Sequence, residues 1–241
     1  YNGKTGPLTV FLRLGSDFTE NYYEYEVPIE FTPWGTSSVN EEIIWPEVNE
    51  MNISLDNLVA VKQNRNTLVS DPDANVSYNT PYWENDGKNK ITVVGTPSLS
   101  DVRVIMVGVR NPKKQLLTDE DDGLPMSAEI WINELRMTDF DESGGWAATA
   151  RMNANLADLG NVSVSGLYST PGFGSIEKKV NERAQETTTQ WDFATNVELG
   201  KFFNEESGIK IPMHFDISET RLSPEYNPLD PDIYLKDDLA L

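Results

Sequence analysis

The chain has 241 residues, a formal net charge of −20 and no cysteine. The acidic balance argues against nucleic-acid binding, which depends on basic patches that neutralise phosphates. The lack of cysteine excludes disulfides, thiolate catalysis and cysteine metal ligands. The chain starts at Tyr1, and no apolar run approaches the roughly 20 residues of a membrane helix. We expect it to be part of a longer polypeptide.

Residues 1–140 alternate short apolar runs with turns, which predicts a β-rich domain. One helix is predicted at Ser54–Asn64, with Ser54 as its N-cap and Leu55, Leu58, Val59 and the stem of Lys62 on one side. Asp71–Asp86 is predicted to be a loop, because it is rich in Asp, Asn and Pro. The predicted strands are Leu8–Leu14, Tyr22–Phe31, Lys90–Val94, Val102–Val109 and Ser127–Met137.

Two of these strands suggest how the domain is layered. Tyr22–Phe31 alternates, with its aromatic and aliphatic residues on one face and Glu24, Glu26, Pro28 and Glu30 on the other. Ser127–Met137 carries apolar residues on both faces, which predicts a strand buried between two layers. It is similar to the final strand of carbohydrate-binding jelly rolls. We therefore predict a jelly-roll-like β-sandwich domain over residues 1–140.

From Trp146 onward the polarity alternates with a period of two. The four alternating segments are Trp146–Leu156, Val162–Tyr168, Gln190–Phe203 and Ile209–Ser218. A tight turn at 158–161 joins the first two, and a longer connection with a helical turn at Ile176–Ala184 joins the next two. Such segments are typical of antiparallel transmembrane β-barrel strands, so residues 146–241 are predicted to be a fragment of a large barrel. An ordinary antiparallel sheet with one wet face is the alternative.

In a barrel the two faces of each segment have different surroundings. The predicted lipid-facing residues are Val162, Val164, Trp191, Phe193, Val197, Ile209, Ile211, Met213, Phe215 and Ile217. The predicted lumen-facing residues are Arg151, Asn153, Asp192, Asn196, Glu198 and Lys210. Aromatic residues near the segment ends suit the interfacial girdles of a barrel. Short connections after the first and third segments indicate the periplasmic side, which puts the start of the first segment at the outer rim.

The sequence offers little enzymatic chemistry, and we expect no catalytic residue. His214 is the single histidine, so neither a Ser-His-Asp triad nor a multi-histidine metal site can be built. We expect no cofactor. The acidic loops Asp71–Asp73 and Asp119–Asp122 have carboxylates of the kind that bind calcium, but not the spacing of an EF-hand loop. Gly172 and Gly174 follow no βαβ pattern that would cradle a phosphate.

Several ordered blocks of sequence resemble one known family. They are INELRMTDFDESGGWAATARMNANLADLGNVSVSG (132–166), STPGFGSIEKKVNER (169–183), ELGKFF (198–203) and YNPLDPDI (226–233). Together they are similar to the SprA/Sov family of giant outer-membrane proteins of Bacteroidetes, which form the translocon of the type IX secretion system and support gliding motility. The resemblance covers residues 130–233 well and the preceding region more loosely.

The resemblance implies a very large single-chain barrel through which folded cargo proteins leave the periplasm. It also implies a PorV-type outer-membrane barrel and a periplasmic plug protein as partners. We expect the chain to lie in the bacterial outer membrane, in contact with the lipid bilayer, with the sandwich domain on the extracellular side. The alternative functions are a carbohydrate-binding module, with Tyr82 and Trp83 stacking on sugar, and an adhesin module of a surface protein.

Overall fold

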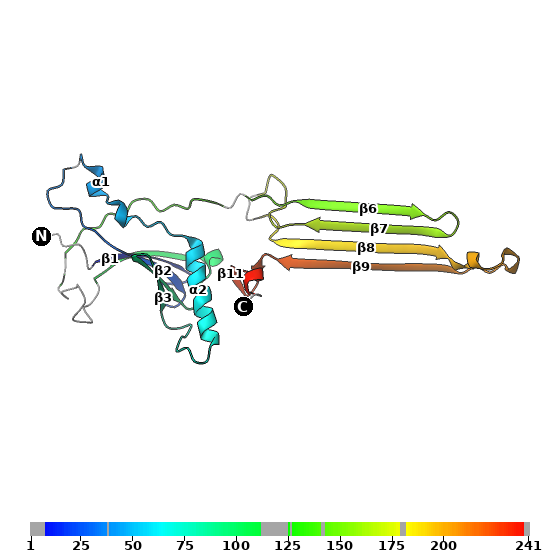
Figure 1. Cartoon of the computed structure of the whole chain (residues 1–241). Helices are drawn as coiled ribbons and strands as arrows, with labels where there is room; N and C mark the ends of the chain where they lie inside the picture. Colours follow the sequence, from blue (N-terminus) through cyan, green and yellow to red (C-terminus); the bar gives the residue numbers. More distant parts are fainter. Residues whose placement is uncertain are drawn as a thin grey trace. The chain divides into compact units, whose positions relative to one another are not determined.

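The computed structural model describes residues 8–37, 39–111, 125, 127–140, 143–178 and 182–238. They form two compact units, each built mainly of antiparallel strands (Figure 1). The first unit lies within Tyr1–Glu134 and includes Leu229–Ile233 from near the end of the chain. The second lies within Leu135–Pro228 and Tyr234–Leu239. The chain is therefore mostly β, as predicted.

The first unit contains one five-stranded antiparallel sheet in the order β3-β4-β2-β1-β5. Its strands are β1 (Thr9–Gly15), β2 (Tyr22–Pro28), β3 (Tyr82–Asp86), β4 (Asn89–Val94) and β5 (Val104–Arg110). Gly87, in the left-handed region at φ +63°, turns the chain between β3 and β4, as a two-residue hairpin requires. The sequence predicted four of these strands, but it assigned β3 to a loop because its Glu, Asn and Asp residues favour turns.

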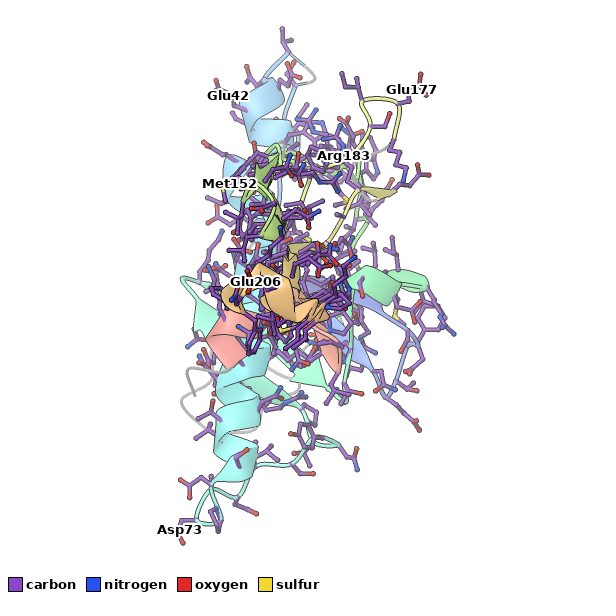
Figure 2. All side chains as sticks on the ribbon, turned by 90° about the vertical axis from the view of Figure 1, so that its right-hand side faces the viewer. Glu42, Asp73, Met152, Glu177, Arg183 and Glu206 are labelled. Carbon is purple, nitrogen blue, oxygen red and sulfur yellow. The ribbon has the colours of Figure 1, made fainter. Side chains whose placement is uncertain are left out.

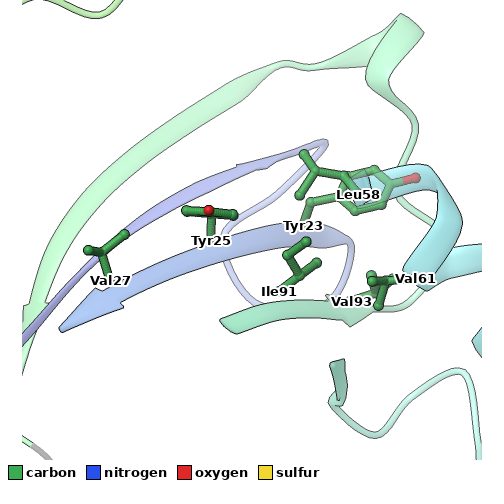
Figure 3. Close-up of a cluster of buried hydrophobic side chains, with 7 residues drawn as sticks. All are labelled: Tyr23, Tyr25, Val27, Leu58, Val61, Ile91 and Val93. Carbon is green, nitrogen blue, oxygen red and sulfur yellow. The ribbon is translucent and has the colours of Figure 1, made fainter. Parts of the chain in front are cut away.

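Helix α2 (Leu55–Ser70) packs on one face of this sheet. Ser54 caps it, since its hydroxyl oxygen accepts a hydrogen bond from the Asn57 amide at 3.4 Å. The helix buries Leu58, Val61, Lys62 and Arg65, which recur at helical spacing, whereas Leu55 is exposed. Figure 3 shows the resulting core, in which the helix meets the inner faces of β2 and β4. Its residues are Tyr23, Tyr25, Val27, Leu58, Val61, Ile91 and Val93.

The predicted sandwich is not seen in the part of the chain that the structure describes. A helix, and no second sheet, covers the five-stranded sheet there. The predicted last strand, Ser127–Met137, forms no ladder, and Trp131 and Leu135 are exposed. Glu134 and Asp139 have φ values of +46° and +54°. These left-handed conformations break the pleat that strand pairing needs, whatever the apolar content of the segment.

The other face of the five-stranded sheet carries buried charges. Glu24 and Glu26, predicted to lie on a polar face, are only 3% and 4% exposed. Arg13 and Arg110 both pair with Glu24, at 2.5 and 2.9 Å. Arg110 also pairs with Glu26 at 2.5 Å, and Lys90 pairs with Glu26 at 2.7 Å. The carboxylates tolerate burial because each is matched by more than one cation.

Glu26 makes the stability of this sheet depend on pH. Burial raises the pKa of Glu26, but hydrogen bonds from Lys90, Thr9 and Arg110 outweigh it and bring the pKa below its ordinary 4.5. The stabilisation is therefore present above pH 4.5 and is lost as the pH falls through the lowered value. We expect the opening free energy of β1 and β2, measured by hydrogen exchange and corrected for intrinsic rates, to fall progressively as the pH is lowered below 4.5.

Glu26→Gln is the matched variant for this pH dependence. It should be less stable than the wild type at neutral pH, since the amide leaves Lys90 without a charge partner and leaves Arg110 with Glu24 alone. It should also lose less stability on acidification. An acid dependence as steep as that of the wild type would show that Glu26 is not the titrating group.

The shorter elements lie in the connections and near the end of the chain. The helical turns are α1 (Glu41–Ile44), η1 (Glu47–Asn49), η2 (Leu99–Asp101), η4 (Leu199–Phe202), η5 (Glu205–Ser207) and α3 (Leu235–Asp238). A two-stranded sheet pairs β10 (Tyr226–Asn227) with β11 (Asp230–Tyr234). Figure 2 labels Glu206 in η5, and Asp73 in the loop that follows α2.

The second unit contains a four-stranded sheet whose strands pair in chain order, as Figure 1 shows. The strands are β6 (Ala147–Asn155), β7 (Gly160–Ser169), β8 (Glu186–Glu198) and β9 (Pro212–Pro224). All four were predicted, although β8 both starts and ends earlier than the predicted Gln190–Phe203, because Leu199–Phe202 forms η4, and β9 both starts and ends later than the predicted Ile209–Ser218. At the predicted helical turn Ile176–Ala184, the Lys178 amide donates to the Ser175 carbonyl at 3.0 Å, and residues 179–181 lie outside the described residues.

Candidate functional site on the four-stranded sheet

Continuous ladders hold β6 to β9 in one register. Met152 pairs with Val164, Val164 with Phe193, and Phe193 with Ile217. Because side chains alternate along a strand, this register puts residues of equal character on the same face in all four strands. Gly160 lies where β7 meets β8, and a Cβ there would stand 2.0 Å from the Asn196 carbonyl oxygen. Glycine at that position allows the two strands to approach at the start of the ladder.

One face of the sheet, here called the apolar face, is hydrophobic over most of its length. Phe193 and Phe215 contact each other with ring centroids 6.2 Å apart. Phe215 is nevertheless 50% exposed, and Met213 and Ile217 are also exposed. No described residue of this unit covers them as α2 covers the core of the first unit. The apolar face includes Ala148, Ala150, Met152, Ala154, Val162, Val164, Tyr168, Trp191, Phe193, Val197, Met213, Phe215 and Ile217.

The opposite face, here called the polar face, carries hydrogen-bonded amides, hydroxyls and charges. The Ser165 hydroxyl donates to Asp192 at 3.0 Å. The Asn196 side-chain amide donates to the Asn161 side-chain oxygen at 2.9 Å. His214 Nδ1 lies 2.6 Å from the Asn196 side-chain oxygen, and its Nε2 lies 3.2 Å from Asp216. All of these contacts except that of His214 with Asp216, which lies within β9, cross from strand to strand, so the polar side chains support the ladder while remaining accessible to water.

The structure brings most of the predicted lipid-facing residues together. Val162, Val164, Trp191, Phe193, Val197, Met213, Phe215 and Ile217 all lie on the apolar face. Ile209 and Ile211 precede β9, which begins at Pro212. The Leu199 amide still donates to the Ile211 carbonyl at 2.8 Å, so the strand pairing extends one step beyond the ladder. That these residues face lipid stays a prediction.

The predicted lumen-facing residues also share a face. Arg151, Asn153, Asp192, Asn196 and Glu198 lie on the polar face, whereas Lys210 lies in the connection before β9. Met152, labelled in Figure 2, lies between Arg151 and Asn153 on β6 and belongs to the apolar face. Adjacent residues of one strand thus lie on opposite faces of the sheet.

A buried group of charged side chains in the first unit was not predicted. Lys62 of α2 is 2% exposed and donates to the carboxylates of Asp230 and Asp232 at 2.5 and 3.2 Å. It also donates to the Pro97 carbonyl at 2.7 Å. The two aspartates belong to YNPLDPDI, one of the blocks that carry the family resemblance. We call Lys62, Asp230 and Asp232 the Lys62 cluster.

Asp232 accepts more hydrogen bonds than Asp230, the other carboxylate of the Lys62 cluster. Its carboxylate also accepts hydrogen bonds from the Tyr23 hydroxyl at 2.7 Å, the Leu99 amide at 2.7 Å and the Ser98 hydroxyl at 3.1 Å. Burial, and then the charge of Asp232, raise the pKa of Tyr23. The tyrosine therefore remains a proton donor to the carboxylate. The cluster fixes Leu229–Ile233 in the first unit, and sequence reasoning missed it because its members are remote in the chain.

The remaining predicted sites are not assembled in the described residues. Tyr82 packs against the core and donates to Glu84 at 2.6 Å, whereas Trp83 lies on the opposite face of β3 and is exposed. They therefore form no common platform for a sugar ring. In the loop after α2, an Asp71 carboxylate oxygen accepts from the Asp73 amide at 3.0 Å. Asp119–Asp122 lies outside the described residues, within which no acidic or histidine cluster could hold a metal ion.

These observations define a class: a mostly β, strongly acidic chain with a two-faced antiparallel sheet. Residues 2–239 match the family model SprA_N, described as motility related/secretion protein, and the chain belongs to that family. No match to a curated protein was found. Among the described helices, none has the length and apolar character needed to cross a membrane.

Proposed function

We propose that this chain is a segment of the protein-conducting outer-membrane translocon of the type IX secretion system. In this proposal β6 to β9 are neighbouring strands of a large β-barrel, with the apolar face toward lipid. The observation that carries the proposal is the exposed apolar face itself. In water, a sheet with this many apolar side chains on one face would be covered by a second layer of protein. In a membrane, lipid covers such a face without further protein.

The bounds of the apolar face support this proposal. Its hydrophobic part runs along β8 from Trp191 to Val197, which spans about 20 Å at roughly 3.3 Å per residue. Beyond β8, the Leu199 amide donates to the Ile211 carbonyl, so two further apolar residues adjoin it. An outer-membrane barrel has an apolar band of about 25 Å bounded by aromatic residues. Trp191 lies at one end of the band, with Tyr168 on the neighbouring strand beyond it. Phe202 and Phe203, both exposed, follow the other end.

The polar face is then the wall of the lumen. Its asparagines, serines and charged residues remain hydrated, so that folded cargo proteins pass without adhering. This role needs no catalytic residue and no cofactor. Family membership supports a part in secretion and motility. The PorV-type barrel, the periplasmic plug protein and the secreted cargo belong to the proposal as partners.

The proposal also gives a direction across the membrane. The shortest connection, at 156–159 between β6 and β7, is of the kind found on the periplasmic side of barrels. The connection between β8 and β9, which contains η4 and η5, is longer than predicted. It therefore gives less support to a periplasmic location of that end of the strands. The start of β6, and the first unit that precedes it in the chain, would accordingly be on the extracellular side.

Fractionation of cells that make the full-length protein tests this proposal. We expect the protein in the outer-membrane fraction, retained there after washes with high salt and with urea, and released only by detergent. Binding through lipid-covered strands resists both washes because it does not depend on surface charge. Release into the salt wash would favour a peripheral adhesin, and recovery from the soluble fraction would rule out a membrane barrel.

A further inference from the structure

The strand register gathers one polar group at the edge of the apolar band. Trp191 lies opposite Glu219 across the β8–β9 ladder, and the next outward pair of this face is Thr189 opposite Arg221. These four residues line an open pocket of about 290 Å³. Thr189, Glu219 and Arg221 are polar, whereas from Trp191 to Met213 this face of β8 and β9 is apolar or aromatic except at Thr195, which is 9% exposed. We call these four residues the Arg221 pocket.

Within the Arg221 pocket, Trp191 and Glu219 are hydrogen-bonded to each other, whereas the Arg221 side chain has no charge partner. The Trp191 indole nitrogen donates to the Glu219 carboxylate at 3.0 Å. The Arg221 side chain forms no hydrogen bond or ion pair with any residue that the structure describes. Its guanidinium therefore presents its full set of donors at the surface.

The position of Arg221 indicates which kind of ligand its side chain would bind. Arg221 is two residues beyond Glu219 on β9, which moves it about 7 Å farther from the middle of the apolar band. If the apolar face contacts lipid, Trp191 is at the interface and Arg221 is level with the headgroups. A guanidinium binds phosphate with two parallel hydrogen bonds, and the neighbouring Thr189 hydroxyl can donate a third.

We propose that the Arg221 pocket binds the phosphate of an anionic lipid of the surrounding membrane. The inference rests on the proposed function, because it needs the apolar face in contact with the bilayer. Arg221 and Thr189 hold the phosphate, and the Trp191 ring contacts the upper part of the acyl chains. Glu219 opposes binding through its charge, and the bond from Trp191 keeps its carboxylate in a fixed place.

Photo-crosslinking of the full-length protein in proteoliposomes tests the pocket. The probe is phosphatidic acid with a diazirine in its acyl chain, and the reference is phosphatidylcholine with the same acyl chain. Labelled peptides that contain β8 and β9 are quantified by mass spectrometry. We expect stronger labelling of these peptides by phosphatidic acid, and a drop of about fivefold in that preference with Arg221→Gln, the typical effect of one cation near anionic lipid.

Two further variants make the result specific. Glu219→Gln should strengthen the preference for phosphatidic acid, since it removes the opposing charge. Arg151→Gln makes the same change of charge on the polar face and should leave the preference unaltered. An opposite order of these effects would overturn the assignment to a lipid phosphate.

The same experiment separates the failure of this inference from the failure of the proposed function. Labelling of β8 and β9 by both lipids, with no preference and no effect of Arg221→Gln, would reject the lipid site and leave the barrel intact. If neither lipid labels these peptides, the sheet does not contact the bilayer, and both proposals fail.

Discussion

Phe215→Arg is expected, on the proposed barrel function, to remove most of the full-length protein from the outer-membrane fraction. Phe215 lies on β9 within the apolar band, pairs with Thr195 and contacts Phe193. An arginine at the midplane of the bilayer on the lipid face of a barrel costs about 2–4 kcal/mol. The lost contact with the Phe193 ring adds to that cost. The measurement is the amount of protein that resists a urea wash of isolated outer membranes.

The neighbouring residue provides the control for Phe215→Arg. Asp216→Arg introduces the same side chain one residue farther along β9, on the polar face, where water can solvate it. We expect it, and also Asp192→Ala on the same face, to assemble nearly as well as the wild type. Equal loss of Phe215→Arg and Asp216→Arg would contradict a lipid-facing apolar face, as would equal tolerance of both.

Asp232→Ala is expected to destabilise the first unit by about 3–5 kcal/mol, the usual cost of removing one partner of a buried ion pair. The change leaves Lys62 with Asp230 as its remaining carboxylate. It also leaves the Tyr23 hydroxyl and the Leu99 amide without their hydrogen-bond acceptor. Hydrogen exchange of peptides that contain Leu99 and β4, measured in the full-length protein, reports the loss locally.

Two comparisons test whether the charge of Lys62 causes this effect. Asp230→Ala should cost less, because the Asp230 side chain is 21% exposed and water can replace part of its contact. Lys62→Met combined with Asp232→Ala should cost less than the sum of the two single variants, since each change removes the same ion pair. A double variant as unstable as the sum of the single variants would show that Lys62 and Asp232 act independently.

Much of the second unit is predictable from local sequence. A period of two along Gln190–Phe203 is enough to predict both a strand and which of its residues share a face. Register then follows from the same pattern, because a slip by one residue would mix apolar and polar side chains on each face. The ladder confirms this for Phe193, Thr195 and Val197 opposite Ile217, Phe215 and Met213.

The first unit was harder to predict, because its decisive contacts join distant residues. Ser127–Met137 has the composition of a buried strand, but its local pattern does not reveal the left-handed backbone at Glu134. Glu24 and Glu26 fit a polar outer face by their alternation. They are buried because Arg13, Lys90 and Arg110 arrive from three other strands.

By itself, the sequence determined the mostly β composition, the alternation of β6 to β9 and the family resemblance, because these depend on residue type and near neighbours in the chain. Only the tertiary structure decided that α2 covers the sheet and that Lys62 meets Asp230 and Asp232. The physical reason is that Lys62 and the two aspartates are far apart in the chain. A buried lysine needs a carboxylate, but nothing in its local sequence specifies which of the 39 acidic residues supplies it.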